Sequence, residues 1–201
     1  MPVTYRRATP QDIDAIVQVH NVAFPGFFLT SLGDHFLQLV YRAFLEIDSG
    51  ICIVAQDGDR LHGVVAGAAN PALFFATLRR RRGVRLALAA APRLLHNPLH
   101  LVRKCVWAFF YRGEQPAAMS EAGLLSSVAV SPEVSSRGIG QQLVDTFCGE
   151  LRCRRVESVY LITDQTDNEL VNRFYRKCGF HLVDTIERFE KRRMNRWAKS
   201  L

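Results

Sequence analysis

The C-terminal half of the chain alternates between two apolar periods, and this alternation constrains its fold more than any other feature. Leu124–Val130 and Ser158–Thr163 are short apolar runs of the kind found in buried strands. From residue 138 to residue 151, apolar side chains recur every three or four positions, as on one face of a helix. The same spacing recurs over residues 170–178, and a further strand is expected over 180–186. This strand–helix–strand–helix–strand order predicts a sheet covered by helices.

The N-terminal part of the chain adds more strands and two helices. Residues 3–7 have strand character, and so do residues 51–56 and 61–69, which are separated by the turn signal Asp57-Gly58-Asp59. Two helices are expected between the first strand and this hairpin, and the second of them follows Asp34. The whole order predicts the α/β (α+β) class, with helices on a mixed sheet.

Length and charge suggest one domain that carries an unusual segment. With 201 residues, 48% of them hydrophobic, residues 1–201 are expected to form a single domain with a real core. The net charge is +7, but residues 71–118 contain eight Arg, one Lys and one Glu and so carry +8 by themselves. Arginines alternate there with apolar side chains. We interpret residues 71–118 as a basic amphipathic insertion, broken near Pro92 and Pro98.

Several roles are open for this insertion. It could be a lid over an anionic acceptor, a peripheral contact with a membrane, a homodimer contact, or a solvated helical hairpin with an ordinary buried stripe. We favour the lid, because the insertion leaves the sheet beside the expected cleft. Clustered charge alone permits weak binding to nucleic-acid phosphates. No base-reading motif is present, so no sequence-specific nucleic-acid partner is expected.

The cysteines and the start of the chain bear on its compartment. The five cysteines are an odd number without any C-x-x-C pair, which argues against a disulfide framework and against a zinc site. We therefore expect no metal. The start has no apolar segment typical of a secretory signal, and no apolar run is long enough to span a bilayer. A cytoplasmic protein is the expectation.

A loop with two glycines joins the strand that ends at Val130 to the helix that follows it. The loop ends in Ser135-Ser136-Arg137-Gly138-Ile139-Gly140-Gln141. Glycines let a ligand approach the backbone, amides at a helix start cradle anions, and Arg137 adds positive charge. A pyrophosphate would suit this place. The third glycine of a dinucleotide fingerprint and the Gly-Lys-Ser/Thr of a P-loop are both missing, and a helix start without a ligand is the alternative.

A second motif follows the next strand, and the two motifs together resemble the GNAT superfamily of acyl-CoA N-acyltransferases. That family's motifs run Val-x-Pro-(x)n-(Gln/Arg)-x-x-Gly-x-(Gly/Ala) and Asn-x-x-Ala-x-x-x-Tyr-x-x-x-Gly-Phe. The matching positions here are Val130, Pro132, Gly138, Gly140, Asn168, Tyr175, Gly179 and Phe180. Ser135 stands in place of Gln or Arg. The resemblance implies a mostly antiparallel, twisted central sheet flanked by helices.

The resemblance also implies acetyl-CoA as the co-substrate. Backbone groups of Val128 and Val130 would pair with the pantetheine arm like an added strand, and amides of residues 136–141 would hold the pyrophosphate. Asn168 would approach the arm, and Tyr175 would lie near the sulfur. The expected cofactor-binding residues are Val128, Ala129, Val130, Ser135, Ser136, Arg137, Gly138, Ile139, Gly140, Gln141, Asn168 and Tyr175.

Acetyl transfer needs a neutral amine, a polarised thioester carbonyl and a stabilised leaving thiolate. Tyr175 is the candidate that stabilises the thiolate, chiefly by a hydrogen bond, because a phenol is a weaker acid than a thiol. The base is less evident, since the strand position where some family members carry Glu is Thr163 here. Glu121, just before the cofactor strand, is the first choice. His62, Asp164 and His35 are the other candidates.

The acceptor is expected to meet the aromatic loop of residues 21–33. Phe27, Phe28 and Thr30 are its candidate contacts, although the aromatic side chains could equally anchor the loop to the core. This loop and the ending Met194-Asn195-Arg196-Trp197 are similar to GNAT proteins of the polysaccharide-biosynthesis type. We therefore expect direct acetyl transfer to a small-molecule primary amine of the amino-sugar class. Acetylation of a protein terminus or lysine, and a non-catalytic acyl-CoA-binding module, are the alternatives.

Overall fold

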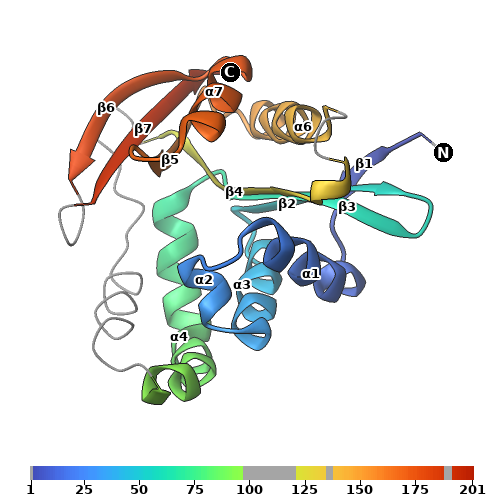
Figure 1. Cartoon of the computed structure of the whole chain (residues 1–201), viewed down its shortest axis with the longest axis vertical. Coiled ribbons are helices and arrows are strands. Elements are labelled where there is room, and N and C mark those ends of the chain that lie inside the picture. Colours follow the sequence, from blue (N-terminus) through green and yellow to red (C-terminus); the bar gives the residue numbers. More distant parts are fainter. Residues whose placement is uncertain (1, 97–120, 135–137, 188–191) are drawn as a thin grey trace.

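A computed structural model describes residues 2–96, 121–134, 138–187 and 192–201 of the chain (Figure 1). These residues form a seven-stranded sheet in the order β1-β2-β3-β4-β5-β7-β6. The strands are β1 (Thr4–Arg7), β2 (Gly50–Asp57), β3 (Arg60–Ala68), β4 (Gly123–Val130), β5 (Ser158–Asp164), β6 (His181–Glu187) and β7 (Arg193–Ser200). The helices are α1 (Ile13–Ala23), α2 (Phe28–Ser31), α3 (Asp34–Glu46), α4 (Pro71–His96), α6 (Ile139–Cys153) and α7 (Glu169–Lys177). The expected class and the mostly antiparallel sheet are confirmed.

The sheet divides between β4 and β5. All other neighbouring strands pair antiparallel, whereas β4 and β5 are parallel and pair only at Gly123–Val159 and Leu124–Tyr160. Beyond that point β4 continues along β3 to Val130, and β5 continues along β7 to Asp164. The two halves of the sheet therefore diverge, as Figure 1 shows, and one edge of β4 is left open in the middle of the sheet.

Helices cover both faces of the β1–β4 half. Because side chains alternate along a strand, β2 and β3 each supply one set of buried residues to either face. Val54 and Val64 pack with α1 and α3 in one core cluster. Ile53 and Val65 pack with Leu143 and the rest of α6 in the other cluster. Figure 1 shows α6 on one side of these strands and α1 and α3 on the opposite side.

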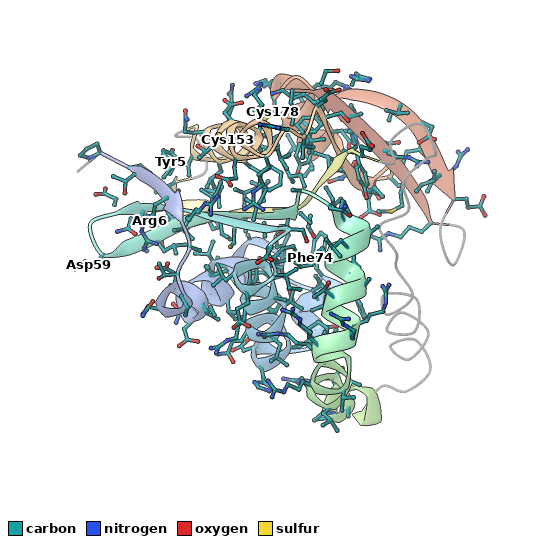
Figure 2. The ribbon with its side chains drawn as sticks, turned by 180° about the vertical axis from the view of Figure 1, so that it is seen from behind. Tyr5, Arg6, Asp59, Phe74, Cys153 and Cys178 are labelled. Atoms are coloured by element: carbon teal, nitrogen blue, oxygen red, sulfur yellow. The ribbon has the colours of Figure 1, made fainter. Side chains whose placement is uncertain are left out.

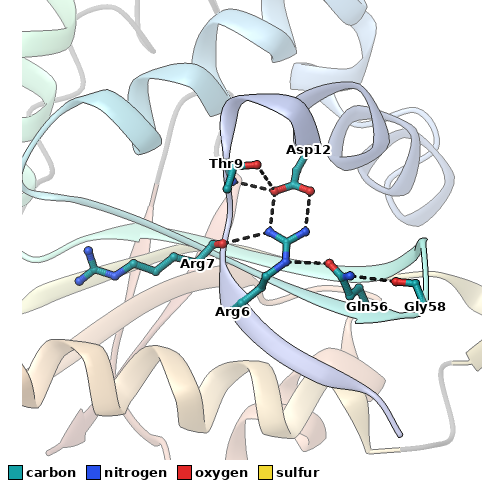
Figure 3. Close-up of polar contacts among 6 residues, drawn as sticks. All are labelled: Arg6, Arg7, Thr9, Asp12, Gln56 and Gly58. Atoms are coloured by element: carbon teal, nitrogen blue, oxygen red, sulfur yellow. Dashed lines mark hydrogen bonds and ion pairs between the residues drawn. The ribbon is translucent and has the colours of Figure 1, made fainter. Parts of the chain in front are cut away.

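A charged cluster fixes the turn from β1 into α1 (Figure 3). Two guanidinium nitrogens of Arg6 donate to the Asp12 carboxylate at 2.7 and 2.8 Å, and Arg6 Nε donates to Gln56 Oε1 on β2 at 2.7 Å. Asp12 also accepts from the backbone nitrogen and the hydroxyl of Thr9, at 2.7 and 2.9 Å. The Arg6 hydrogen bonds are the main reason why the pKa of Asp12 falls to about 2.

The described part of the basic insertion is the long helix α4, which packs beside α3 (Figures 1 and 2). Phe74, labelled in Figure 2, is fully buried and stacks on Phe44 of α3 at 4.5 Å between ring centroids. The expected break near Pro92 is wrong, because the helix runs on to His96. Pro92 is exposed in the last two turns, where water can satisfy the carbonyl that loses its amide partner. Pro98 lies outside the described residues.

Candidate active site

The divergence of β4 and β5 exposes backbone in the centre of the sheet. Ser126 is exposed and Ser127 and Val128 are half-buried, although β4 is a central strand. From Leu125 to Val130, the backbone groups that point toward β5 pair with no strand among the described residues. An extended ligand can hydrogen-bond to such an edge as an added strand does. The predicted backbone contacts Val128, Ala129 and Val130 lie along this edge.

A β-bulge interrupts β4 at the point where the edge opens. Ala66 of β3 is opposite Ser127 and Gly67 is opposite Leu125, so Ser126 is the extra residue. Gly67 is required here, because a Cβ at this position would lie 2.1 Å from the carbonyl oxygen of Leu124 and 2.5 Å from the Phe147 ring. The bulge interrupts the pairing of β4 with β3 and leaves residue 126 without a register partner on β3. It is a fixed place where an amide can polarise a carbonyl.

The start of α6 lies just beyond the other end of this edge. Gly138 is its N-cap residue, with φ of 74°, and apart from its chain neighbours no atom of the described residues lies within 4 Å of the position that a Cβ would take. A glycine offers no side chain to cap the helix, so the amides of Ile139, Gly140 and Gln141 are left without helical partners. These amides, at the positive end of the helix dipole, suit an anion. Ser135, Ser136 and Arg137 lie outside the described residues.

Gly140 has a packing role as well. A Cβ on Gly140 would lie 3.3 Å from the ring of Phe174 in α7 and 3.6 Å from Val130. The glycine therefore lets α6 approach α7 and the end of β4 closely. The sequence predicted ligand access at this position, and the structure adds contact between helices as a second reason for a glycine.

Tyr175 is buried on the inner face of α7, with 8% of its surface exposed. Its ring packs edge-on against Phe174 and Phe180, at 5.0 and 5.7 Å between centroids. Within the described part of the chain its hydroxyl makes no hydrogen bond. Burial raises the pKa of this hydroxyl above its ordinary value of 10.0. The group is therefore a permanent donor near neutral pH.

A chain of two hydrogen bonds joins Trp197, Thr163 and Asn172. Trp197 Nε1 donates to Thr163 Oγ1 at 2.9 Å, and Thr163 Oγ1 donates to Asn172 Oδ1 at 2.8 Å. All three residues are buried. Thr163 cannot act as a base, and the structure gives it this structural role instead. Asn168 is the N-cap residue of α7, and its Nδ2 donates to the Asp164 carbonyl at 3.1 Å.

The four candidate bases come from different parts of the chain. Glu121 is exposed two residues before β4, and four residues lie between it and the bulge at Ser126. Asp164 is paired with Arg192, and His35 is exposed at the start of α3. His62 on β3 is buried, and its Nδ1 has no hydrogen-bond partner within the described ranges of the chain.

The aromatic loop folds partly onto itself. Phe27 is 51% exposed and contacts Phe24 at 5.3 Å between ring centroids. Phe28 begins the short helix α2 and is half-buried, and the hydroxyl of Thr30 donates to the Phe24 carbonyl at 2.8 Å. Phe24 packs on the core, as the anchoring alternative proposed, while Phe27 remains available to a ligand. The sequence had not indicated that α2 would form.

One polar group was missed by the sequence analysis. His20 of α1 lies on the buried helix face, and its Nδ1 is 2.8 Å from the hydroxyl of Tyr41 in α3. The signal was present in the sequence, because a histidine in an apolar helix stripe needs a partner. Nothing local in the sequence showed which residue that partner would be.

Comparisons with known proteins agree with this geometry. The model of the acetyltransferase (GNAT) family matches residues 13–180. No curated protein matches the sequence. Among solved structures, a putative acetyltransferase of the GNAT family from Desulfovibrio desulfuricans is 16% identical, with a TM-score of 0.66 and 99% of each chain covered.

Two further solved structures share the fold. The ribosomal-protein-S18-alanine N-acetyltransferase from Escherichia coli is 11% identical, with a TM-score of 0.59 and coverage of 99% of this chain and 94% of that one. The PaiA N-acetyltransferase from Thermoplasma acidophilum, in complex with coenzyme A, is 12% identical, with a TM-score of 0.60 and full coverage of both chains.

Proposed function

Because the chain belongs to the GNAT family of acetyltransferases, which use acetyl-CoA, we propose that it transfers the acetyl group directly to the primary amine of an amino sugar. The open edge of β4, which runs from the bulge at Ser126 toward the uncapped start of α6 at Gly138, carries this proposal. An extended thioester arm fits the edge, and a pyrophosphate fits the free amides at the helix start. The acetyl carbonyl then lies at the bulge.

The residues of this chain have distinct tasks in the proposed reaction. Acetyl-CoA, when bound, supplies an acetyl thioester whose carbonyl carbon the amine attacks. Val128 and Val130 orient the arm through their backbone groups, and an amide at the bulge polarises the carbonyl oxygen. Tyr175 donates a hydrogen bond to the sulfur as negative charge develops on it. Its raised pKa favours a hydrogen bond over full proton transfer.

The proposal of an amino-sugar acceptor rests on the residues expected to line the acceptor side of the site. Phe27 offers an exposed aromatic face in the loop between α1 and α2, and such faces stack on the apolar face of a sugar ring. The resemblance of this loop and of residues 194–197 to polysaccharide-type members supports the same acceptor class. Acetylation of a protein amine is the second candidate. It is favoured by the shared fold of the E. coli enzyme named for a ribosomal-protein alanine.

A screen of primary amines tests this proposal. The purified chain is incubated with acetyl-CoA and, in separate reactions, with free amino sugars, nucleotide-linked amino sugars, short peptides with a free N-terminus and aliphatic diamines. Free thiol is measured, and the acetylated product is identified by mass. Turnover of amino sugars with a product acetylated on nitrogen is the expected result. Turnover of peptides alone would replace the amino sugar by a protein acceptor, and acetyl-CoA binding without any turnover would favour the non-catalytic module.

A further inference from the structure

A pocket of about 270 Å³ lies at the start of β2, beyond the point where β1 leaves this strand. The Ala8 amide donates to the Cys52 carbonyl at 2.9 Å, and Gly50 and Ile51 have no neighbour on this edge among the described strands. The ends of α3 and α6 contribute the other walls. Arg154 follows the last residue of α6, whereas the candidate pyrophosphate site lies at the opposite end of this 15-residue helix, about 22 Å away. The pocket is therefore separate from the candidate active site.

Two arginines of the pocket share a single carboxylate. Glu150 Oε1 accepts a hydrogen bond from Arg154 Nε at 2.9 Å and is also paired with Arg7 Nη2. Figure 3 shows the Arg7 side chain pointing away from the cluster of Arg6 and Asp12. One negative charge faces two positive charges, so positive charge is left over at this wall. Each guanidinium has five N–H donors, and the donors that remain suit a second carboxylate.

The end of α3 supplies negative charge to the same pocket. Asp48 lines it with an exposed carboxylate that forms no ion pair with the described residues. Phe44 and Leu45, in the last turn of α3, also line it, and the final carbonyls of a helix lie at the negative end of its dipole. Arg154 Nη1 donates to the backbone carbonyl of Asp48 at 2.5 Å, so the guanidinium and residue 48 are adjacent. A ligand with neighbouring positive and negative groups fits this arrangement.

The remainder of the lining is apolar, and the pocket is small. Phe44, Ile47 and Ile51 line it and are buried side chains of the core. Pockets for drug-sized ligands typically have volumes of roughly 300–1,000 Å³, so a volume of about 270 Å³ suits a small metabolite better than a nucleotide or an oligosaccharide. The lining therefore favours a ligand with a short apolar body next to its two charged groups.

We propose that this pocket binds a free α-amino acid with an apolar side chain, such as leucine. The carboxylate of the amino acid binds the guanidinium groups of Arg7 and Arg154, its ammonium group binds the Asp48 carboxylate, and its side chain packs between Phe44 and Ile51. A simple monocarboxylate would leave the Asp48 carboxylate without a partner, and a simple amine would leave the two arginines with Glu150 alone. The proposal does not depend on acetyl transfer, because none of these residues belongs to the expected acetyl-CoA site.

Calorimetry with L-leucine and three analogues tests the ligand class on the wild-type protein. The analogue 4-methylpentanoate lacks the ammonium group, 3-methylbutylamine lacks the carboxylate, and glycine lacks the apolar side chain. Leucine should bind with a stoichiometry of one, and each analogue should bind at least tenfold more weakly. No binding of leucine at millimolar concentrations would overturn the proposal. Equal affinities for leucine and 4-methylpentanoate would also overturn it.

Variants of two exposed side chains separate the two charge contacts. Asp48→Asn should weaken leucine binding at least tenfold without changing the affinity for 4-methylpentanoate, which has no ammonium group. Arg7→Gln should weaken leucine binding at least fivefold without changing the affinity for 3-methylbutylamine, which has no carboxylate. Asp59→Asn and Arg42→Gln remove the same charges from exposed positions outside the pocket and should bind leucine as the wild type does. Wild-type leucine affinity in both pocket variants would contradict the proposal.

Leucine carries a primary amine, so binding in this pocket has to be distinguished from binding at the acceptor site. Saturating coenzyme A and glucosamine should leave the leucine affinity of the wild-type protein within twofold. Asp48→Asn should retain the wild-type affinity for coenzyme A. Displacement of leucine by glucosamine would assign leucine to the acceptor site and overturn the separate pocket. Because these measurements need no turnover, failure of the proposed acetyl transfer would leave their outcome unaffected.

Discussion

Tyr175 combines two properties that suit a group facing a departing thiolate: its ring is held between Phe174 and Phe180, and its hydroxyl stays protonated. Tyr175→Phe should therefore lower kcat by about 10²-fold, the usual size of a general-acid contribution. Affinity for acetyl-CoA, measured by calorimetry, should stay within threefold of wild type, because the ring packing is kept. Turnover above half of the wild-type rate would make Tyr175 a structural residue.

The ion pair between Arg6 and Asp12 leads us to predict how the stability of the protein changes at acidic pH. The pKa of Asp12 is lowered from 3.8 to about 2 in the folded chain. Its stabilisation is therefore fully present above pH 4 and is lost as the pH falls from about 4 to 2. Asp12→Asn should reduce the free energy of unfolding by about 2 kcal/mol at pH 7 and by much less at pH 2. Urea unfolding at both pH values measures this difference.

An exposed carboxylate provides the control for that experiment. Asp59 lies in the turn between β2 and β3 (Figure 2), so Asp59→Asn should change the free energy of unfolding by less than about 0.5 kcal/mol at either pH. An equal loss for Asp12→Asn at pH 2 and pH 7 would show that the Asp12 charge is not the source of its contribution.

At the scale of single residues, the sequence indicated which residues belong to the site better than it indicated their hydrogen-bond partners. The spacing of Asn168 and Tyr175 predicted a motif on one helix, and the structure has these residues at the start of α7 and along it. It could not predict that Asn172 would bond Thr163 and that Trp197 would complete the chain. These contacts join α7, β5 and β7, and they exist only after the sheet has formed.

At the scale of elements, apolar periodicity predicted the strands and most helices, because each buries one face. It did not predict the divergence of β4 and β5. Their apolar runs look alike, and the pairing stops after Leu124 through tertiary geometry. Nor did the apolar periodicity of the sequence predict the β-bulge at Ser126. The requirement for glycine at position 67 becomes visible only when Leu124 and Phe147 are in place.

The exposed arginines of helix α4 allow a prediction about acceptor binding at this scale. Its residues Arg80, Arg81 and Arg85 are exposed, whereas Arg82 is paired with Glu46 of α3. If α4 helps to bind an anionic acceptor, changing the three exposed arginines to Gln should raise KM for a nucleotide-linked amino sugar at least fivefold. Acetyl-CoA affinity should not change, because these residues lie on another element than the α6 cradle.

A matched triple variant controls for the loss of positive charge. Arg42, Arg152 and Arg155 are exposed outside α4, and their change to Gln should leave both kinetic constants unchanged. Loss of salt-sensitive binding to anionic vesicles in the α4 variant, with normal kinetics, would instead assign the helix to a membrane surface. Among the described residues no helix has the length and apolar character needed to cross a membrane.

At the scale of the whole molecule, the positive charge is concentrated in one segment of the chain. Residues 71–118 carry +8, whereas the protein as a whole carries +7, so the rest of the chain is close to neutral. The anion site proposed at α6 therefore depends on backbone amides and the helix dipole more than on a general positive field. The sheet divided between β4 and β5 connects this site to the α1–α3 side, where the acceptor is expected.

The affinity of Gly138 variants for acetyl-CoA tests the central claim most directly. Gly138→Asp puts a carboxylate at the free amides of α6, and Gly138→Asn puts a neutral group of similar size in the same left-handed conformation. Gly149→Asp adds the same charge to an open position near the other end of α6. Calorimetry should show at least tenfold weaker binding for Gly138→Asp, about 1.4 kcal/mol, a smaller loss for Gly138→Asn and none for Gly149→Asp. Wild-type affinity in a folded Gly138→Asp variant would contradict the account.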